Sequence, residues 1–196
     1  MTASESGLRE TILTTAKSLF IQHGYRGLAM RQISDALGVS KAALYYHFKD
    51  KEELFIAILS ANLNEIENAI NDIQAKKISC SEQIALFIEY VLNQPAGQRA
   101  IIRLGSQEMA HVSDTARQKF GKTYQDQFIG KLQNIFQTGV ENGEFRPIDS
   151  SIATWALLGM MYPYFYPDHA ESAHLHPENI RQIISIYMNG VTQSNG

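Results

Sequence analysis

The chain has 196 residues, of which 44% are hydrophobic and 19% are charged, and its formal net charge is −3. The apolar share can fill a sizeable core, and the low charged share excludes a highly charged disordered chain. No stretch approaches the roughly 18 unbroken apolar residues of a membrane-spanning helix, and the first residues lack the basic and apolar regions of a secretory signal, so we expect no membrane partner.

Apolar residues at helical spacing run through almost the whole chain, whereas alternating strand patterns are nearly absent. The first predicted helix spans 8–23, with Gly24 as its C-cap. Two short helices follow, over 29–37 and 40–48, and a long helix begins near Asp50. The sequence therefore predicts an all-α protein that begins with a cluster of three helices.

Helical spacing continues beyond residue 80, and capping residues mark several helix ends. Asp114 and either Asp149 or Ser150 are predicted N-caps, and Pro177 suits the first turn of the final helix. The further predicted helices span 81–93, 98–110, 114–142, 150–165 and 177–190.

Residues that could carry chemistry do not gather into a recognised catalytic or metal-binding pattern. The lone Cys80 cannot form an internal disulfide, which is typical of a cytoplasmic protein, and we interpret it as a small apolar side chain. The loop 166–176 holds His169, His174 and His176, whose spacing matches no recognised ligand arrangement. We expect no metal, no cofactor and no enzymatic activity.

The two short helices and the tripeptide between them form a helix-turn-helix pattern. Gly38 can take the positive φ angle that a tight turn needs, and the apolar Val39 can pack between the helices. Ser40 can cap the second helix with its hydroxyl group. The inward-facing positions are apolar and one helical turn apart within each helix: Ile33, Leu37, Leu44 and Phe48. The second helix is therefore expected to pack its inner, apolar face against the preceding helices.

The outer face of the second short helix carries a cation, a small residue and aromatic rings with polar groups: Lys41, Ala42, Tyr45, Tyr46 and His47. Such a face fits the major groove of double-stranded DNA, because lysine and tyrosine bind phosphates or base edges and a small residue allows close approach. Lys51, near the start of the next helix, is predicted to add a phosphate contact. An ordinary corner between packed helices is the alternative, but packing does not explain two adjacent tyrosines on a solvent face.

The charge distribution agrees with a DNA-binding N-terminal segment. Residues 1–51 carry seven basic and four acidic side chains, a net charge of +3. Residues 52–196 carry ten basic and sixteen acidic side chains, a net charge of −6. A basic segment followed by an acidic remainder is typical of a polyanion-binding module joined to a different module.

Three sequence segments closely resemble the DNA-binding domain of TetR-type transcriptional regulators. They are Gly24-Tyr25, RQISDALGVS over 31–40 and LYYHFKDKEEL over 44–54. The resemblance implies a three-helix DNA-binding head over 1–50 and, over 51–196, a helical body that dimerises and binds a small effector, with about nine helices in total. It also implies DNA contacts from the outer face described above, from Lys51 and from Arg31, to which we add Ser40.

The chain departs from the family pattern at two places in this region. Leu28-Ala29 stands where the family often has threonine or serine, so a helix cap or phosphate contact is missing there. Ala42-Ala43 replaces the usual glycine-threonine or similar pair, which removes a hydroxyl contact. Base readout is therefore expected to depend more on Lys41, on Tyr46 and on contact between the alanines and thymine methyl groups.

A pocket for a small effector needs mostly apolar and aromatic walls with a few polar groups. The body offers such residues, although aromatic side chains at helical spacing also build cores and Arg103 could instead form a surface ion pair. A ligand that fits these walls would be hydrophobic or aromatic. The predicted ligand-binding residues are Phe87, Tyr90, Arg103, Met109, Tyr124, Phe128, Trp155 and Tyr162.

Two predicted helices, over 149–166 and 177–191, carry apolar faces that could pair with a second copy of the chain. These faces could instead only cover the core, but the family resemblance favours a homodimer. Operator geometry also favours it, since two recognition helices about 34–36 Å apart, or a multiple of that, read an inverted repeat. The predicted interface residues are Ile152, Trp155, Gly159, Ile180, Ile184 and Tyr187.

The sequence thus favours a one-component transcriptional regulator, usually a repressor, that binds DNA as a homodimer and responds to a small effector. A helical adaptor that has lost DNA binding is one alternative. The groove-facing residues are intact, which argues against it: Lys41, Tyr45, Tyr46 and Lys51. A small helical enzyme or carrier is another, and the missing acid–base or metal cluster in the sequence argues against that class.

Overall fold

The computed structural model describes residues 3–166 and 175–192, which are helical apart from turns, short links and one isolated bridge between Phe145 and Thr192. The predicted all-α class is confirmed. The chain divides into two compact units. Met1–Asn62 and Ala100–Gly121 form the head unit, and Leu63–Arg99 and Lys122–Gly196 form the body unit.

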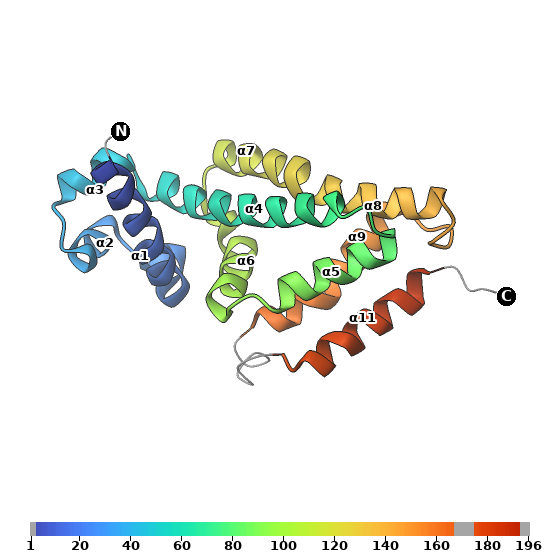
Figure 1. The fold of residues 1–196 in the computed structure, drawn as a ribbon. Helices are drawn as coiled ribbons and strands as arrows, with labels where there is room; N and C mark the ends of the chain where they lie inside the picture. Colours follow the sequence, from blue (N-terminus) through green and yellow to red (C-terminus); the bar gives the residue numbers. More distant parts are fainter. Residues whose placement is uncertain (1–2, 167–174, 193–196) are drawn as a thin grey trace. The chain divides into compact units, whose positions relative to one another are not determined.

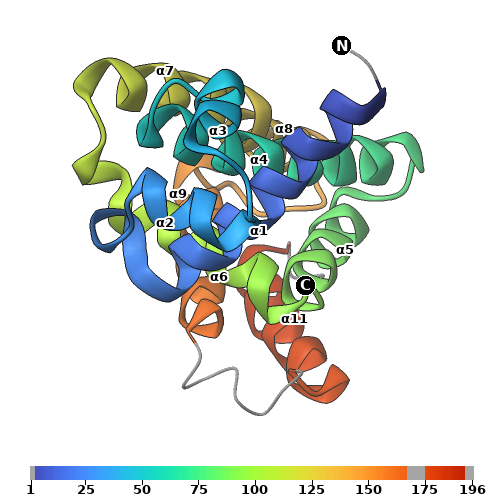
Figure 2. The ribbon, with the colours of Figure 1, turned by 90° about the vertical axis from the view of Figure 1, so that its left-hand side faces the viewer.

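The head unit begins with three helices that pack together, as Figure 1 and Figure 2 show. Its elements are α1 (Ala3–Gly27), α2 (Met30–Leu37), α3 (Lys41–His47), the first part of α4 (Lys51–Ala75), most of α6 (Ala96–Glu108), η1 (Met109–His111) and most of α7 (Asp114–Tyr124). The second helix contacts both α1 and α3. The predicted three-helix cluster is therefore confirmed.

Gly24, the predicted end of the first helix, is instead a kink inside α1. Its φ of 70° and ψ of 169° interrupt the helix, which then continues to Gly27. A Cβ atom at Gly24 would also lie 2.9 Å from Oε1 of Glu108. The positive φ and the close approach both favour glycine at this position.

One cluster of buried apolar side chains holds the head unit together. Phe20, Tyr25 and Phe55 form its aromatic centre, with ring centroids between 4.8 and 6.1 Å apart. Its other members are Ile12, Ala16, Leu28, Met30, Ile33, Leu44, Phe48, Leu54, Ile58, Leu59, Ile101, Leu104 and Val112. This burial orders α2 and α3, because helices of eight and seven residues are marginal by themselves in water.

Ser113, not the predicted Asp114, caps α7. The Oγ atom of Ser113 accepts a hydrogen bond from the backbone N–H of Ala116 at 3.2 Å, and Asp114 is the first helical residue. Ser113 also donates from its backbone N–H and its hydroxyl to the two carboxylate oxygens of Glu52, at 2.6 and 2.7 Å. These bonds join the start of α7 to the start of α4 within the head unit.

The body unit is a bundle in which α8 packs against α5 and α9, and α11 packs alongside α5 (Figure 1). Its elements are the rest of α4, α5 (Cys80–Leu92), the π turn η2 (Gln125–Ile129), α8 (Gly130–Glu141), α9 (Ser150–Met161), the 3-10 turn η3 (Tyr162–Phe165) and α11 (Pro177–Val191). The predicted caps hold at two helices: Asp149 Oδ1 accepts a hydrogen bond from the backbone N–H of Ile152 at 2.9 Å, and Pro177 opens α11.

Two predicted helices are less regular than expected. The helix predicted over 114–142 contains the π turn Gln125–Ile129, which lies between α7 and α8. The helix predicted over 150–165 ends at Met161 and gives way to a 3-10 turn. Pro163 lies in that turn, and proline cannot donate the backbone hydrogen bond that a continuing α-helix requires.

The remaining residues with potential chemistry have ordinary surroundings. Cys80 is buried, as predicted. His176 is exposed before α11, whereas His169 and His174 lie outside the described residues. Over the parts of the chain that the structure describes, no group of three His, Cys, Asp or Glu side chains could hold a metal ion. Over the same parts, every helix is too short or too polar to cross a membrane.

Candidate nucleic-acid interface

The turn between α2 and α3 has the predicted geometry. Gly38 adopts φ 65° and ψ 25°, in the left-handed region that favours glycine. Its backbone N–H donates to the carbonyl of Asp35 at 3.2 Å, and the N–H of Val39 donates to the carbonyl of Ser34 at 3.1 Å. These bonds satisfy the last carbonyls of α2 and fix the direction in which α3 leaves the turn.

The start of α3 is held by a serine cap. The Oγ atom of Ser40 accepts a hydrogen bond from the backbone N–H of Ala43 at 3.1 Å. Its hydroxyl hydrogen remains a donor, because a hydroxyl group can accept and donate at once. Ser40 is exposed, so it can hold the helix and contact a phosphate oxygen at the same time.

The inner face of α3 is buried in the core of the head unit. Leu44 is fully buried and Phe48 is 1% exposed. The guanidinium carbon of Arg9 lies 5.1 Å from the centre of the Phe48 ring, a cation–π contact from α1. Because both anchoring side chains are enclosed, α3 cannot rotate about its axis without losing core packing.

The outer face of α3 is open to solvent. Tyr46 is 74% exposed and Tyr45 is 49% exposed, and Lys41 and Ala42 are also exposed. The Tyr46 ring meets the edge of His47, with centroids 5.2 Å apart and planes at 84°, which orients the tyrosine. The predicted division of α3 into a buried and an exposed face is therefore present in the structure.

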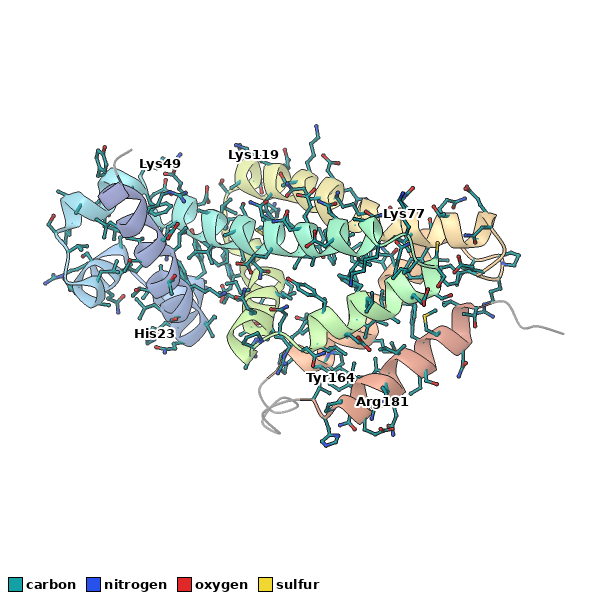
Figure 3. The ribbon with its side chains drawn as sticks, viewed as in Figure 1. His23, Lys49, Lys77, Lys119, Tyr164 and Arg181 are labelled. Carbon is teal, nitrogen blue, oxygen red and sulfur yellow. The ribbon has the colours of Figure 1, made fainter. Side chains whose placement is uncertain are left out.

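The turn that follows α3 adds a cation to this surface. Lys49 is exposed, and Figure 3 labels it on the segment that joins α3 to α4. Its backbone N–H donates to Oε2 of Glu53 at 2.8 Å, which fixes the backbone and leaves the side chain in solvent. Lys49 was not among the predicted contacts, although its place two residues after His47 was a usable signal that it lies near the outer face of α3.

The start of α2 has the weaker cap that its sequence suggests. Ala29 occupies the N-cap position and has no side-chain acceptor. The Oε1 atom of Gln32 accepts a hydrogen bond from the backbone N–H of Ala29 at 2.8 Å, so only half of a capping box is present. Nearby, Arg31 pairs with Asp35 at 3.6 Å with both side chains exposed. An exposed pair of this kind is weak, so Arg31 can exchange Asp35 for a phosphate.

Lys51, a predicted phosphate contact, also binds the backbone of the head unit. Its ammonium group donates to the carbonyl of Tyr25 at 2.8 Å and to that of Leu28 at 2.9 Å, and it lies 4.4 Å from the centre of the Tyr25 ring. Burial lowers the pKa of Lys51, and Glu108 partly opposes this shift. Lys51 thus holds the end of α1 and the loop before α2, with at most one donor left for DNA.

The predicted ligand-binding residues lie in several different surroundings. Arg103 and Met109 belong to the head unit, where Met109 packs against the core. Tyr162 stands beside Tyr166, with hydroxyl oxygens 3.2 Å apart. Trp155 is 53% exposed on α9, so within its own protomer it does not line an enclosed pocket.

Three of the predicted pocket aromatics do meet in the body unit. The Phe128 ring centroid lies 5.9 Å from that of Phe87 and 5.2 Å from that of Tyr124. Phe87 and Phe128 are buried, and burial raises the pKa of Tyr124 to about 12. These rings suit the apolar wall of a pocket, and they also serve as core.

Tyr90 lies apart from that cluster, in a shallow depression between α4 and α5. The depression has a volume of about 400 Å³ and mixes apolar residues such as Ile73 with charged ones such as Lys76 and Glu89. The hydroxyl of Tyr90 donates to the carbonyl of Glu65 at 3.4 Å. This open, polar surface does not match the apolar walls predicted for the effector.

The predicted interface residues divide between the two helices. On α9, Ile152 is 65% exposed and Trp155 is 53% exposed, and Gly159 is exposed on the same face. The Ile152 and Trp155 side chains therefore present apolar surface to solvent on the body unit.

The α11 half of the predicted interface needs correction. Ile180 is 3% exposed and Tyr187 is 7% exposed, and the hydroxyl of Tyr187 donates to the carbonyl of Ala153 at 2.7 Å. Both residues therefore pack in the core of this chain and not on its surface. Ile184 is half-buried, whereas Ile186, which was not predicted, is 69% exposed.

The fold and the exposed α3 define a helix-turn-helix protein, and comparison with known families agrees. The family described as "Bacterial regulatory proteins, tetR family" matches residues 12–58. The family described as "Tetracyclin repressor-like, C-terminal domain" matches residues 77–164. Together the two matches span more than half of the chain, which belongs to the TetR family of bacterial transcriptional regulators.

Individual relatives are similar over most of their length. The HTH-type transcriptional regulator QacR of Staphylococcus aureus is 28% identical over 95% of this chain and 99% of its own. The HTH-type transcriptional repressor KstR2 of Rhodococcus jostii is 25% identical over 78% of this chain and 75% of its own. The structure of AibR with isovaleryl coenzyme A and operator DNA has a TM-score of 0.74 at 23% identity, and covers 94% of this chain and 97% of AibR.

Proposed function

We propose that this regulator is a repressor that binds an inverted-repeat operator as a homodimer and releases it when a small, hydrophobic or aromatic effector binds. In this proposal residues 1–50 bind DNA, and residues 51–196 bind the effector and dimerise. The relatives named above are transcriptional regulators, not enzymes, and we propose no catalytic role for this chain.

The exposed face of α3 carries the proposal. Tyr46 is 74% exposed although tyrosine is a costly side chain to leave in water, and it lies beside Lys41, Ala42 and Tyr45 on a helix whose other face is buried. A rigid helix with hydroxyl, ammonium and small apolar groups matches the donors, acceptors and methyl groups of the major groove. The proposed DNA contacts are Arg31, Ser40, Lys41, Ala42, Tyr45, Tyr46 and His47.

The exposed apolar face of α9 supports the homodimer. Ile152 and Trp155 would lose contact with water if α9 packed against its copy, and tryptophan is frequent among the residues that dominate binding energy at interfaces. A two-fold interface would place two α3 helices in successive major grooves of an inverted repeat. The α11 contribution would come from its exposed side, which includes Ile186.

The effector and the direction of regulation are supported by relatives. AibR is described with isovaleryl coenzyme A and operator DNA, and KstR2 is described as a repressor. In this chain the Phe87, Tyr124 and Phe128 rings offer an apolar wall in the body unit. An effector that prefers a dimer with mismatched head spacing weakens DNA binding by its differential affinity for the two states. We propose that α4 carries this coupling, because it is one continuous helix from Lys51 to Ala75.

Selection of host genomic fragments by the purified protein tests this function. We expect recovery of an inverted repeat that binds far more tightly than random DNA, with an affinity that falls steeply as salt rises. Recovery of only weak, sequence-independent binding would contradict the proposal and favour the adaptor alternative.

Two lysine variants show whether the contact lies where we place it. Lys41→Ala removes a cation from the outer face of α3, and it should weaken binding and reduce the salt dependence by about one phosphate contact. Lys76→Ala removes an exposed cation from the body unit and should leave both unchanged. Equal effects of the two variants would mean that net charge, not the α3 face, determines binding.

A further inference from the structure

Among the described residues, Arg99 is the one arginine or lysine that is buried. It lies in the first turn of α6, four residues after Pro95, and belongs to the body unit. Only 2% of its surface is exposed. Arginine keeps its positive charge at any physiological pH, even though burial lowers the pKa of Arg99. A buried charge of this kind requires compensation.

One side of the guanidinium group is held by backbone. The Nη1 atom donates to the carbonyl of Leu92 at 2.9 Å and to that of Gln94 at 2.8 Å. Leu92 is the last residue of α5, where helix carbonyls lack partners within the helix, and Gln94 follows two residues later. These two bonds fix the guanidinium plane and neutralise part of its charge through backbone dipoles.

The other side of the guanidinium group is unused. Within the described ranges, Nε and Nη2 have no hydrogen-bond partner, and both atoms are shielded from solvent. In arginine, the Nε–H bond and one Nη2–H bond point in the same direction and form a fork that matches two oxygens of one carboxylate. A fixed fork that is shielded from solvent and has no partner among the described residues costs free energy in the folded state, and a bound anion would recover this cost.

The charge balance selects the kind of anion. A carboxylate carries one negative charge and matches one guanidinium group. A phosphate group carries about −1.5 to −2 at neutral pH, and no second buried lysine or arginine accompanies Arg99 in the described chain. The neighbouring Val91 and Leu92 are buried and apolar, so the rest of the ligand is expected to be apolar.

We propose that Nε and Nη2 of Arg99 bind the carboxylate of a small apolar acid, and that this acid is the effector. The second part rests on the proposed function, since only a ligand-responsive regulator has an effector. An acidic side chain of the chain itself is the competing partner for the fork, and a test with added ligands separates the two.

Thermal unfolding of the full-length protein with matched ligands is the first test. The probes are straight-chain acids from butanoate to dodecanoate and the primary amide of each acid. We expect at least one acid to raise the unfolding temperature and its amide, which has the same apolar chain and no charge, to have no effect. If no acid exceeds its amide on the wild-type protein, the proposal is wrong, because the fork is then already occupied or inaccessible.

Arginine variants locate the binding site. Calorimetric titration with the acid that gives the largest shift should show binding to Arg99→Gln weakened by at least about 30-fold. Arg181→Gln is the matched control, since Arg181 is exposed on α11 and pairs with Glu178 at 2.5 Å (Figure 3). It should bind as the wild type does, and equal binding by Arg99→Gln would overturn the site. If Arg99→Gln does not fold, Arg99→Lys replaces it in the titration, because lysine keeps the positive charge but lacks the paired Nε–H and Nη2–H donors.

DNA binding by the same preparation separates this proposal from the proposed function. A wild-type protein that binds its operator but does not distinguish acids from amides would overturn the carboxylate site and leave the repressor function intact. A protein that binds acids through Arg99 but selects no operator would support the carboxylate site and contradict the repressor function.

Discussion

The head unit and the body unit use the same kind of amphipathic helix with different clarity. On α3 and its C-cap, Leu44 and Phe48 are buried and the intervening Tyr45 and Tyr46 are exposed, as their spacing requires. On α9 and α11 both helices are rich in apolar residues, yet α9 exposes Ile152 and α11 buries Ile180. The exposed face of a helix can be predicted from the sequence when that face is polar. When a helix is apolar on several sides, its sequence does not indicate which side packs against the core.

The largest expected effect concerns the core behind α3. Leu44→Ala removes a fully buried side chain and should lower the free energy of unfolding by about 2–5 kcal/mol, measured by chemical denaturation. Leu157→Ala makes the same cavity in the body unit, where Leu157 is also fully buried. Both should destabilise the protein, but after correction for unfolded protein only Leu44→Ala should also weaken DNA binding, because Leu44 anchors α3 to the core of the head unit. Equal DNA affinity in the two variants would break the comparison between the units.

The exposed face of α9 should give the next largest effect. Trp155→Ser removes the largest exposed apolar side chain of that helix and should weaken dimerisation by about 2 kcal/mol or more. Analytical ultracentrifugation over a concentration series measures the dissociation constant. Lys77→Ser, on an exposed lysine of the body unit, is the control. A dimer that is unaffected by Trp155→Ser would place the interface elsewhere, with the exposed Ile186 of α11 as the next candidate.

A smaller effect separates Lys51 from Lys41. Lys51→Ala leaves the carbonyls of Tyr25 and Leu28 without their donor and should cost about 1–3 kcal/mol of stability. After correction for unfolded protein, the DNA affinity of Lys51→Ala should have the same salt dependence as that of the wild type. The salt dependence of Lys41→Ala should be smaller. If Lys51→Ala reduced the salt dependence of DNA binding as much as Lys41→Ala does, Lys51 would be a phosphate contact, as predicted from the sequence.

The smallest expected effect is a gain in stability. Ala29→Ser supplies the N-cap acceptor that α2 lacks and should raise the free energy of unfolding by about 0.5–1 kcal/mol. Ser40→Ala removes the equivalent cap from α3, where Oγ accepts from Ala43, and should lower it by a similar amount. If Ala29→Ser gave no gain, the bond from Gln32 would already satisfy the start of α2.

Local rules predicted the head well because its features lie within a few residues of one another. The positive φ of Gly38, the Ser40 cap and the alternation of Leu44 with Tyr45 each depend on neighbours in sequence. The backbone contacts of Lys51 were not predicted, because their acceptors, the carbonyls of Tyr25 and Leu28, are more than twenty residues away in the sequence. The pattern of side-chain types in a sequence does not indicate which backbone carbonyls will accept a hydrogen bond from a distant lysine.

The same local sequence rules predicted the body unit less well. The π turn at Gln125–Ile129 lies inside a run whose apolar spacing is helical throughout. Tyr187 was assigned to the interface because it is apolar and on the right helix, but its hydroxyl bonds to the carbonyl of Ala153 on α9. Arg99 was overlooked because an arginine near a helix start is ordinarily exposed, and only the packed structure reveals its burial.

Binding of the selected inverted repeat by wild-type and Tyr46→Ala protein tests the central claim most directly. The account predicts that Tyr46→Ala remains a folded dimer and binds the repeat about 10- to 100-fold more weakly, since a base or phosphate contact is worth about 1–3 kcal/mol. Binding to scrambled DNA of the same length should change much less. Equal affinity of the two proteins for the repeat would contradict the claim that the exposed face of α3 reads the operator.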